Sequence, residues 1–249
     1  MTLRWRADGV SDTGLRRAQN EDTLVLDHDE GLVIVADGMG GRPGGEYASS
    51  LAAQVIQEHL SSPEGSVGEP GDRMAEAVSL ANSTVWEAAQ ADPERQGMGT
   101  TVTALALDGN SASWIIGHVG DSRGYVFRDG ELRRITRDHT VVQDLMESGA
   151  ISPSSIADHP LGHLINRAVG TEETVEVDTF EGDALEGDIF LLCSDGLAGL
   201  MTDTEIEAAL QGLTPTGLKE KSAELVAIAH ERGAPDNVTL GFLAIEDVA

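Results

Sequence analysis

Hydrophobic and polar residues follow two different periods along this chain, and each change of period separates strands from helices. The runs 23–27 and 31–36 are short and mostly apolar, with a polar turn between them, so they predict a β-hairpin. From residue 45 the apolar positions recur every three to four residues up to residue 60, and they do so again over 74–88. This pattern predicts two amphipathic helices behind the hairpin.

Short strand-like runs then return in close succession, and they predict a meander of antiparallel strands. Asp129-Gly130 supplies a hairpin turn before the last of them. The four runs are 100–107, 112–119, 122–127 and 131–135. A helix is predicted over 140–146, and residues 147–162 hold Gly, Pro, Ser and His without any period, which is typical of a long loop that covers a site.

The last part of the chain again combines strands with paired helices. A strand is predicted over 188–193, and the helix after it opens with capping-box spacing between Thr202 and Glu205. A second helix over about 216–232 and a strand over 237–245 follow. Because strict strand-helix alternation is absent, the pattern favours antiparallel sheets covered by helices over a doubly wound parallel sheet.

The composition narrows the class of protein. At 249 residues and without a Pro/Ser-rich linker, the chain is expected to form a single domain. The formal net charge of −27 disfavours nucleic acids and membrane surfaces as partners, because their phosphates would be repelled. The lone cysteine, Cys193, suits a reducing compartment. With no leader-like apolar segment and no long apolar run, the expected location is the cytoplasm.

Three apolar strands end at an aspartate beside a glycine, and this repeated ending is the clearest sign of chemistry. Asp37, Asp121 and Asp195 follow such strands, and Asp236 stands just before the final one. Four converging carboxylates cannot all stay ionised without cations, and a site of oxygen ligands favours Mg²⁺ or Mn²⁺, with the carbonyl of Gly38 as a further ligand. An isolated Asp-Gly is more often a turn, and spacing alone leaves open whether the four carboxylates meet.

Seven motifs, taken together and in order, resemble the metal-dependent serine/threonine protein phosphatases of the 2C (PPM) type, bacterial branch. The motifs are SDTGLRRAQNED at 11–22, VADGMGG at 35–41, GTT at 99–101, HVGDSR at 118–123, TRDH at 136–139, SDGL at 194–197 and PDNVT at 235–239. The resemblance implies an α+β fold, a four-layer α-β-β-α sandwich in which two antiparallel β-sheets pack face to face with helices outside. It also implies one catalytic domain over 1–249 with a flap subdomain at about 144–166.

The resemblance further implies a set of metal ligands. Asp37 would bridge two Mn²⁺ or Mg²⁺ ions, and Gly38 would give its carbonyl oxygen to one of them. Asp195 and Asp236 would complete the ligands of the other ion, while Asp121 with Asp195 would hold a third, weaker ion.

Three further residues receive roles from the same resemblance. Glu21 and Asp22 would act mostly through metal-bound waters, and Arg17 would bind the substrate phosphate, for which a planar guanidinium is suited. The implied reaction is in-line attack of a metal-bridging hydroxide on phosphoserine or phosphothreonine. Implied partners are phosphorylated proteins, including substrates of a Ser/Thr kinase in the same cell; the sequence does not indicate an oligomeric state.

Two positions depart from the family pattern. Arg42 stands where many bacterial members have histidine after Met-Gly-Gly, so that a proton donor there is in doubt and a second phosphate contact by Arg42 is one hypothesis. His163 is a candidate for a substitute acid, although a lone loop histidine is more often plain surface. A cysteine phosphatase is excluded, because Gly199 stands where C-x5-R needs arginine.

Two alternatives remain open. One is a catalytically weak phosphatase fold that serves as a regulatory or phosphoprotein-binding module. Arg42 in place of the usual histidine is compatible with this alternative. The other is a two-metal phosphodiesterase or nuclease, which the charge of −27 disfavours.

Overall fold

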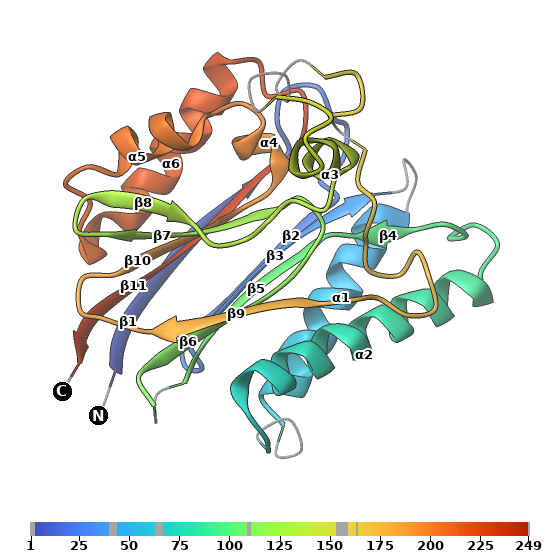
Figure 1. The fold of residues 1–249 in the computed structure, drawn as a ribbon, viewed down its shortest axis with the longest axis horizontal. Coiled ribbons are helices and arrows are strands. Elements are labelled where there is room, and N and C mark those ends of the chain that lie inside the picture. Colours follow the sequence, from blue (N-terminus) through green and yellow to red (C-terminus); the bar gives the residue numbers. More distant parts are fainter. Residues whose placement is uncertain are drawn as a thin grey trace.

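A computed structural model describes residues 3–39, 44–62, 67–108, 111–152, 159–162 and 164–248. Two antiparallel sheets face each other, and their layers lie between two groups of helices (Figure 1). The first sheet has the order β1 (Leu3–Asp12), β11 (Val238–Val248), β10 (Ile189–Cys193), β7 (Arg123–Arg128) and β8 (Glu131–Arg134). The second has the order β2 (Asp22–Asp27), β3 (Leu32–Met39), β5 (Val102–Asp108), β6 (Ser113–Val119) and β9 (Asp178–Asp183), with β4 (Gly99–Thr100) paired to β3.

Helices cover the outer face of each sheet. Helices α1 (Gly44–Leu60) and α2 (Pro70–Ala91) pack on the second sheet, and α5 (Asp203–Leu210) and α6 (Leu218–Glu231) pack on the first (Figure 1). The described residues also include three shorter elements: α3 (Val141–Glu147), α4 (Asp195–Ala198) and the 3-10 turn η3 (Pro215–Gly217). No helix in the described ranges is long and apolar enough to cross a bilayer.

Three apolar layers hold the sandwich together. One lies between the second sheet and α1 and α2, another between the first sheet and α4 to α6, and the third between the two sheets. In this third layer the rings of Trp114 and Phe190 meet with their centroids 5.6 Å apart. Full burial of a Val, Leu, Ile, Phe or Met side chain stabilises the folded state by about 1.5–3 kcal/mol. The predicted four-layer α-β-β-α arrangement is therefore confirmed.

The predicted meander is wrong at one point. Strands β5 and β6 pair in the second sheet, whereas β7 and β8 pair in the first, so the chain changes sheet over residues 120–122. Apolar periodicity marks a strand but does not say which sheet receives it, and a three-residue connection is equally compatible with a hairpin. The Asp129-Gly130 turn between β7 and β8 is as predicted, with φ of 54° and 83°.

Strands β1 and β9 were not predicted. Each lies at the edge of its sheet, and each interrupts its apolar positions with charged residues, as edge strands commonly do. The helix predictions are confirmed within a few residues, and so is the capping box between Thr202 and Glu205.

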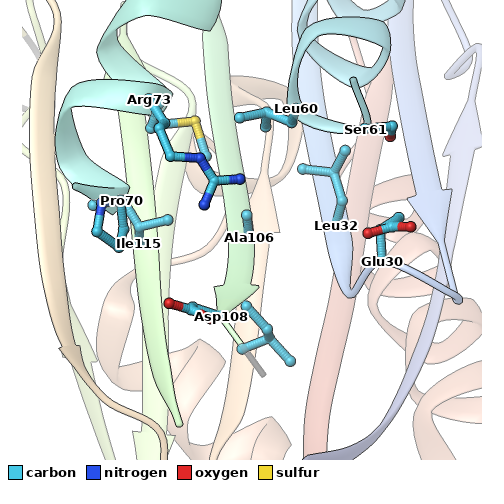
Figure 2. A pocket seen from close by; sticks show the side chains of 11 residues that line it. Glu30, Leu32, Leu60, Ser61, Pro70, Arg73, Ala106, Asp108 and Ile115 are labelled. Carbon is cyan, nitrogen blue, oxygen red and sulfur yellow. The ribbon is translucent and has the colours of Figure 1, made fainter. Parts of the chain in front are cut away.

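One end of the sandwich gathers the acidic motifs. Strands β3, β6 and β10 all end there, and β11 begins there. A pocket at the other end of the second sheet, between Leu60 of α1 and Arg73 of α2, lies beside the start of β3 and the end of β5 (Figure 2). Because it is at the opposite end of these strands, this pocket is separate from the acidic motifs.

Candidate metal centre

Asp37 follows the five consecutive buried residues of β3, Leu32–Ala36, and neighbouring chain segments hold its backbone. Its N–H donates to Thr101 Oγ1 at 3.0 Å, while its carbonyl accepts from the N–H of Thr101 at 2.8 Å and from Thr100 Oγ1 at 2.9 Å. The residue keeps a partial contact with solvent although protein surrounds the carboxyl on most sides. Burial, followed by the charges of nearby aspartates, raises the pKa of Asp37 well above its usual value.

Asp22 lies directly opposite Asp37 in the β2–β3 pair. Residues opposite each other on adjacent strands project to the same face, so this register brings two carboxylates together. The hydroxyl of Ser194 donates to Asp22 Oδ2 at 2.9 Å. Burial raises the pKa of Asp22 to about 6, against the opposing effect of hydrogen bonds from Thr239 and Ser194.

The segments that carry Asp195 and Asp236 can approach each other because the residue after Asp195 is a glycine without a side chain. A Cβ on Gly196 would lie 1.8 Å from the carbonyl oxygen of Asn237, so only glycine lets the start of α4 approach the segment before β11 so closely. Burial and the charge of Asp236 raise the pKa of Asp195, whose carboxyl also lies within hydrogen-bond reach of Asp37. Asp195 is thus adjacent to two other members of the predicted ligand set.

Asp121 follows β6, at the connection where the chain changes sheet. Burial, and then the charge of Asp195, raises the pKa of Asp121 to about 7. Its neighbour Arg123 instead forms a two-pronged ion pair with Asp138, with nitrogen–oxygen distances of 2.8 to 3.2 Å. The HVGDSR and TRDH motifs therefore bind each other here.

Arg17 lies at the rim of the site, where its side chain is 45% exposed. It donates to Asp236 Oδ2 at 2.6 Å and lies 4.0 Å from the carboxylate of Glu21. The predicted phosphate ligand is thus placed beside the predicted metal ligands. Arg42 and His163 both fall outside the described residues.

Glu21 and Gly38 occupy the same corner of the site. The carbonyl of Glu21 accepts from the Gly38 N–H at 3.1 Å and from Ser49 Oγ at 2.6 Å. A Cβ on Gly38 would lie 2.2 Å from the Gly45 carbonyl oxygen, so glycine is required by packing as well as by the predicted ligand role. Burial raises the pKa of the Glu21 carboxyl, opposed by Arg17.

Several residues that hold the ligands in place received no role from the sequence. The side chain of Asn237 donates to the carbonyls of Thr13 and Gln19 at 2.9 and 3.0 Å and accepts from the Glu21 N–H at 2.9 Å. It therefore ties the first motif to the last. The sequence could have indicated these residues only through the motifs, which contain Thr101, Ser194 and Asn237.

The donor set suits a divalent cation. The six carboxylates and the Gly38 carbonyl are all hard oxygen donors. Burial removes water from charged groups and is the main reason why the pKa values of Glu21, Asp22, Asp37, Asp121 and Asp195 are raised. In the described part of the chain no three His, Cys, Asp or Glu side chains are already arranged to close around one ion. Water or backbone ligands would have to complete each coordination shell, as Mg²⁺ in particular usually requires.

Known proteins match this chain over most of its length. A sequence model of the family protein phosphatase 2C matches residues 16–230. The serine/threonine protein phosphatase PstP of Mycobacterium tuberculosis is 40% identical over 250 residues, which are 99% of this chain and 46% of PstP. The serine/threonine phosphatase stp of Listeria monocytogenes is 33% identical over 239 residues, covering 94% of this chain and 93% of that protein. The chain thus spans about half the length of PstP but nearly all of stp.

Solved structures agree with the sequence matches. The M. tuberculosis PstP/Ppp crystal structure superposes with a TM-score of 0.89 at 38% identity, covering 98% of this chain and all of that one. The PstP catalytic domain in complex with two manganese ions gives 0.87 at 38% identity over 99% of this chain and all of that one. Together with the family match over residues 16–230, these similarities show that the chain belongs to the protein phosphatase 2C family.

Proposed function

We propose that this chain is a metal-dependent protein phosphatase that hydrolyses phosphoserine and phosphothreonine monoesters. The observation that carries the proposal is the convergence of Asp37, Asp195 and Asp236 at one end of the sandwich, with Arg17 beside them. The relatives PstP and stp are named serine/threonine phosphatases, which supports the same reaction.

Asp37 and the Gly38 carbonyl would hold one Mn²⁺ or Mg²⁺ ion, and Asp37 with Asp195 and Asp236 a second. Asp121 with Asp195 would hold a third, weaker ion. When bound, such ions supply Lewis-acid activation of water and offset the negative charge of the phosphoryl group. Glu21 and Asp22 would act through ordered water, as outer groups that orient metal ligands do.

The chain's own groups orient the substrate and the ligands. Arg17 is exposed enough to meet a phosphate, and its planar donors match two phosphoryl oxygens. Thr100 and Thr101 fix the Asp37 backbone by three hydrogen bonds, so the main chain that carries its carboxylate is already in place.

The proposed substrates are phosphorylated proteins, including targets of a Ser/Thr kinase in the same cell. A groove beside Asp121 and Asp195 is lined by Val142 of α3 and by Met201, and it could receive the chain that flanks the phosphorylated residue. The described parts of the proposed flap, residues 144–166, border this groove through His159 and Gly162. We propose a cytoplasmic location, because the lone cysteine, Cys193, is free and buried, which suits a reducing compartment.

Turnover of para-nitrophenyl phosphate in Mn²⁺, Mg²⁺ or EDTA tests the proposal, with Asp195→Asn beside the control Asp129→Asn. The control makes the same charge change at an exposed hairpin turn. We expect Mn²⁺-dependent turnover that EDTA and Asp195→Asn abolish and Asp129→Asn leaves intact. Preference for bis-para-nitrophenyl phosphate would instead indicate a phosphodiesterase. No turnover from a folded protein that binds Mn²⁺ would leave the regulatory module as the function.

A further inference from the structure

The connection between β6 and β7 carries Asp121, and Gly120 sets its path. Gly120 has φ of +111°, a conformation that other residues rarely adopt. A Cβ there would also lie 2.6 Å from the side chain of Thr101, which holds the Asp37 backbone. Gly120 therefore packs against Thr101, which holds Asp37, and directly precedes Asp121.

His139 binds both polar backbone groups of Gly120. The Gly120 N–H donates to His139 Nδ1 at 3.0 Å, and the His139 N–H donates to the Gly120 carbonyl at 2.8 Å. The histidine is fully buried. Buried backbone groups need partners, so the two peptides that flank Gly120 depend on this one residue for their orientation.

The hydrogen-bond pattern fixes the form of the ring. Because a backbone N–H can only donate, Nδ1 must be the acceptor, and the neutral ring carries its proton on Nε2. Nε2 lies 3.2 Å from Asp178 Oδ2 on β9, to which it donates. Arg167 Nη1 lies 3.1 Å from the same nitrogen. Because a guanidinium can only donate, Arg167 bonds to the carboxylate of Asp178, 2.6 Å away, and not to the protonated Nε2. Burial, the largest effect, lowers the pKa of His139, in agreement with a neutral ring.

His139 also contacts the last residues of the proposed flap. Its carbonyl accepts from the Asn166 N–H at 2.9 Å, and Thr140 forms a bridge with Ile165. The ring centroids of His118 and His139 lie 4.8 Å apart. One buried residue thus joins the Asp121 loop, β9 and residues 165–166.

We propose that His139 is a positioning residue for Asp121: Nδ1 fixes the Gly120 peptide, and the bond from Nε2 to Asp178 keeps Nδ1 free to accept. The inference rests on the proposed function, in which Asp121 holds the weaker metal ion. An outer hydrogen bond of this kind commonly changes metal affinity by about 10- to 100-fold when it is lost. A ring that merely filled space would have no such effect.

Two substitutions separate the two nitrogens. His139→Asn places an amide oxygen near Nδ1, which keeps an acceptor for Gly120 and loses the Asp178 contact. His139→Gln reaches toward Nε2, which keeps a donor for Asp178 and loses the Gly120 acceptor. We expect the weakest Mn²⁺ site to lose about tenfold or more in affinity in His139→Gln and clearly less in His139→Asn, as measured by calorimetry. Turnover of para-nitrophenyl phosphate should follow the same order at low Mn²⁺ and recover at high Mn²⁺.

Equal Mn²⁺ isotherms for the two variants, or losses that only follow their melting temperatures, would overturn the inference. The amide resonance of Gly120 provides a readout independent of turnover, and we expect it to move in His139→Gln more than in His139→Asn. If neither variant folds, ¹⁵N NMR spectra of the wild type test the proposal, because they show which ring nitrogen of His139 carries the proton. A proton on Nδ1 would contradict the proposal. Absent turnover in the wild type would reject the proposed function, while the isotherms and resonances would still test His139.

Discussion

The guanidinium of Arg17 donates a 2.6 Å hydrogen bond to Asp236, a residue 219 positions further along the chain. The pair joins the proposed phosphate ligand to a proposed metal ligand at the rim of the site. Since Arg17 is 45% exposed and Asp236 35% exposed, solvent screening keeps their attraction weak enough for a phosphate to compete for the arginine.

Arg17→Ala should raise the KM for para-nitrophenyl phosphate and lower kcat/KM by about 10- to 100-fold, because two charged hydrogen bonds to phosphate are lost. The Mn²⁺ isotherm should change by less than about threefold if Arg17 serves mainly the phosphate. Arg16→Ala is the control, since Arg16 is the exposed neighbour. A large loss of Mn²⁺ affinity with unchanged KM would show that Arg17 supports Asp236 instead.

Asp37→Asn should make the EDTA-treated protein more stable, although it removes a proposed metal ligand. Burial and neighbouring aspartates raise the pKa of Asp37, so ionised Asp37 destabilises the fold at neutral pH. We expect a higher free energy of unfolding for Asp37→Asn than for wild type, measured by urea titration in EDTA. In excess Mn²⁺ the order should reverse, because wild type gains about 2.7 kcal/mol when Mn²⁺ is at 100 times its Kd. A destabilised variant in EDTA would contradict this account.

Buried His118 should make the protein less stable as the pH falls. Its Nε2 donates to the Arg137 carbonyl at 3.0 Å, and burial, the largest effect, lowers its pKa to about 3. The unfolded chain, with an ordinary pKa near 6.5, therefore binds a proton that the folded chain does not. The resulting stability is present above pH 6.5 and is lost as the pH falls toward 3, by about 2 kcal/mol at pH 5.

Urea titrations of wild type and His118→Gln at pH 7.5 and pH 5 measure this effect. The difference between the two proteins isolates His118 from the carboxylates of the metal site, whose raised pKa values act in the opposite direction. Wild type should lose about 2 kcal/mol more than the variant between the two pH values. Parallel losses would mean that His118 titrates normally in the folded protein.

Gly196→Ala should weaken metal binding by separating Asp195 from Asp236. Its Cβ would meet the Asn237 carbonyl oxygen at 1.8 Å, so the backbone has to move. Gly71→Ala is the control, because there the nearest heavy atoms lie 3.9 Å from the added carbon. We expect a loss of about tenfold or more in Mn²⁺ affinity for the first variant and none for the second, measured by calorimetry. Unchanged affinity in a folded Gly196→Ala protein would show that this close approach is not needed.

Local pattern was enough to predict most elements of the fold but not the pairing between them. Thr202 and Glu205 mark a helix start within four residues, and Asp129-Gly130 marks a turn within two, so both signals are complete in a short window. The edge strand β1 gave no such signal, because its charged positions obscure the apolar alternation. The change of sheet after β6 depends on packing between distant segments, which periodicity does not record.

The site divides in the same way. The aspartates at strand ends were visible as residue types, whereas their convergence depends on register and on close contacts. Asp22 meets Asp37 only through the β2–β3 register, and Ser194 reaches Asp22 across 172 residues. The residues that hold the ligands, such as Asn237 and His139, form ordinary hydrogen bonds whose partners no local pattern indicates.

The pairing of β1 with β11 and of Arg17 with Asp236 has a consequence for synthesis of the protein. The N-terminal motif is translated first, but its partners Asp236 and Asn237 leave the ribosome more than two hundred residues later. Contacts at such separation form slowly, because a long loop must close before they gain any energy. The growing chain therefore cannot assemble the proposed metal centre until the last motif has emerged, and the proposed phosphatase activity can begin only after that point.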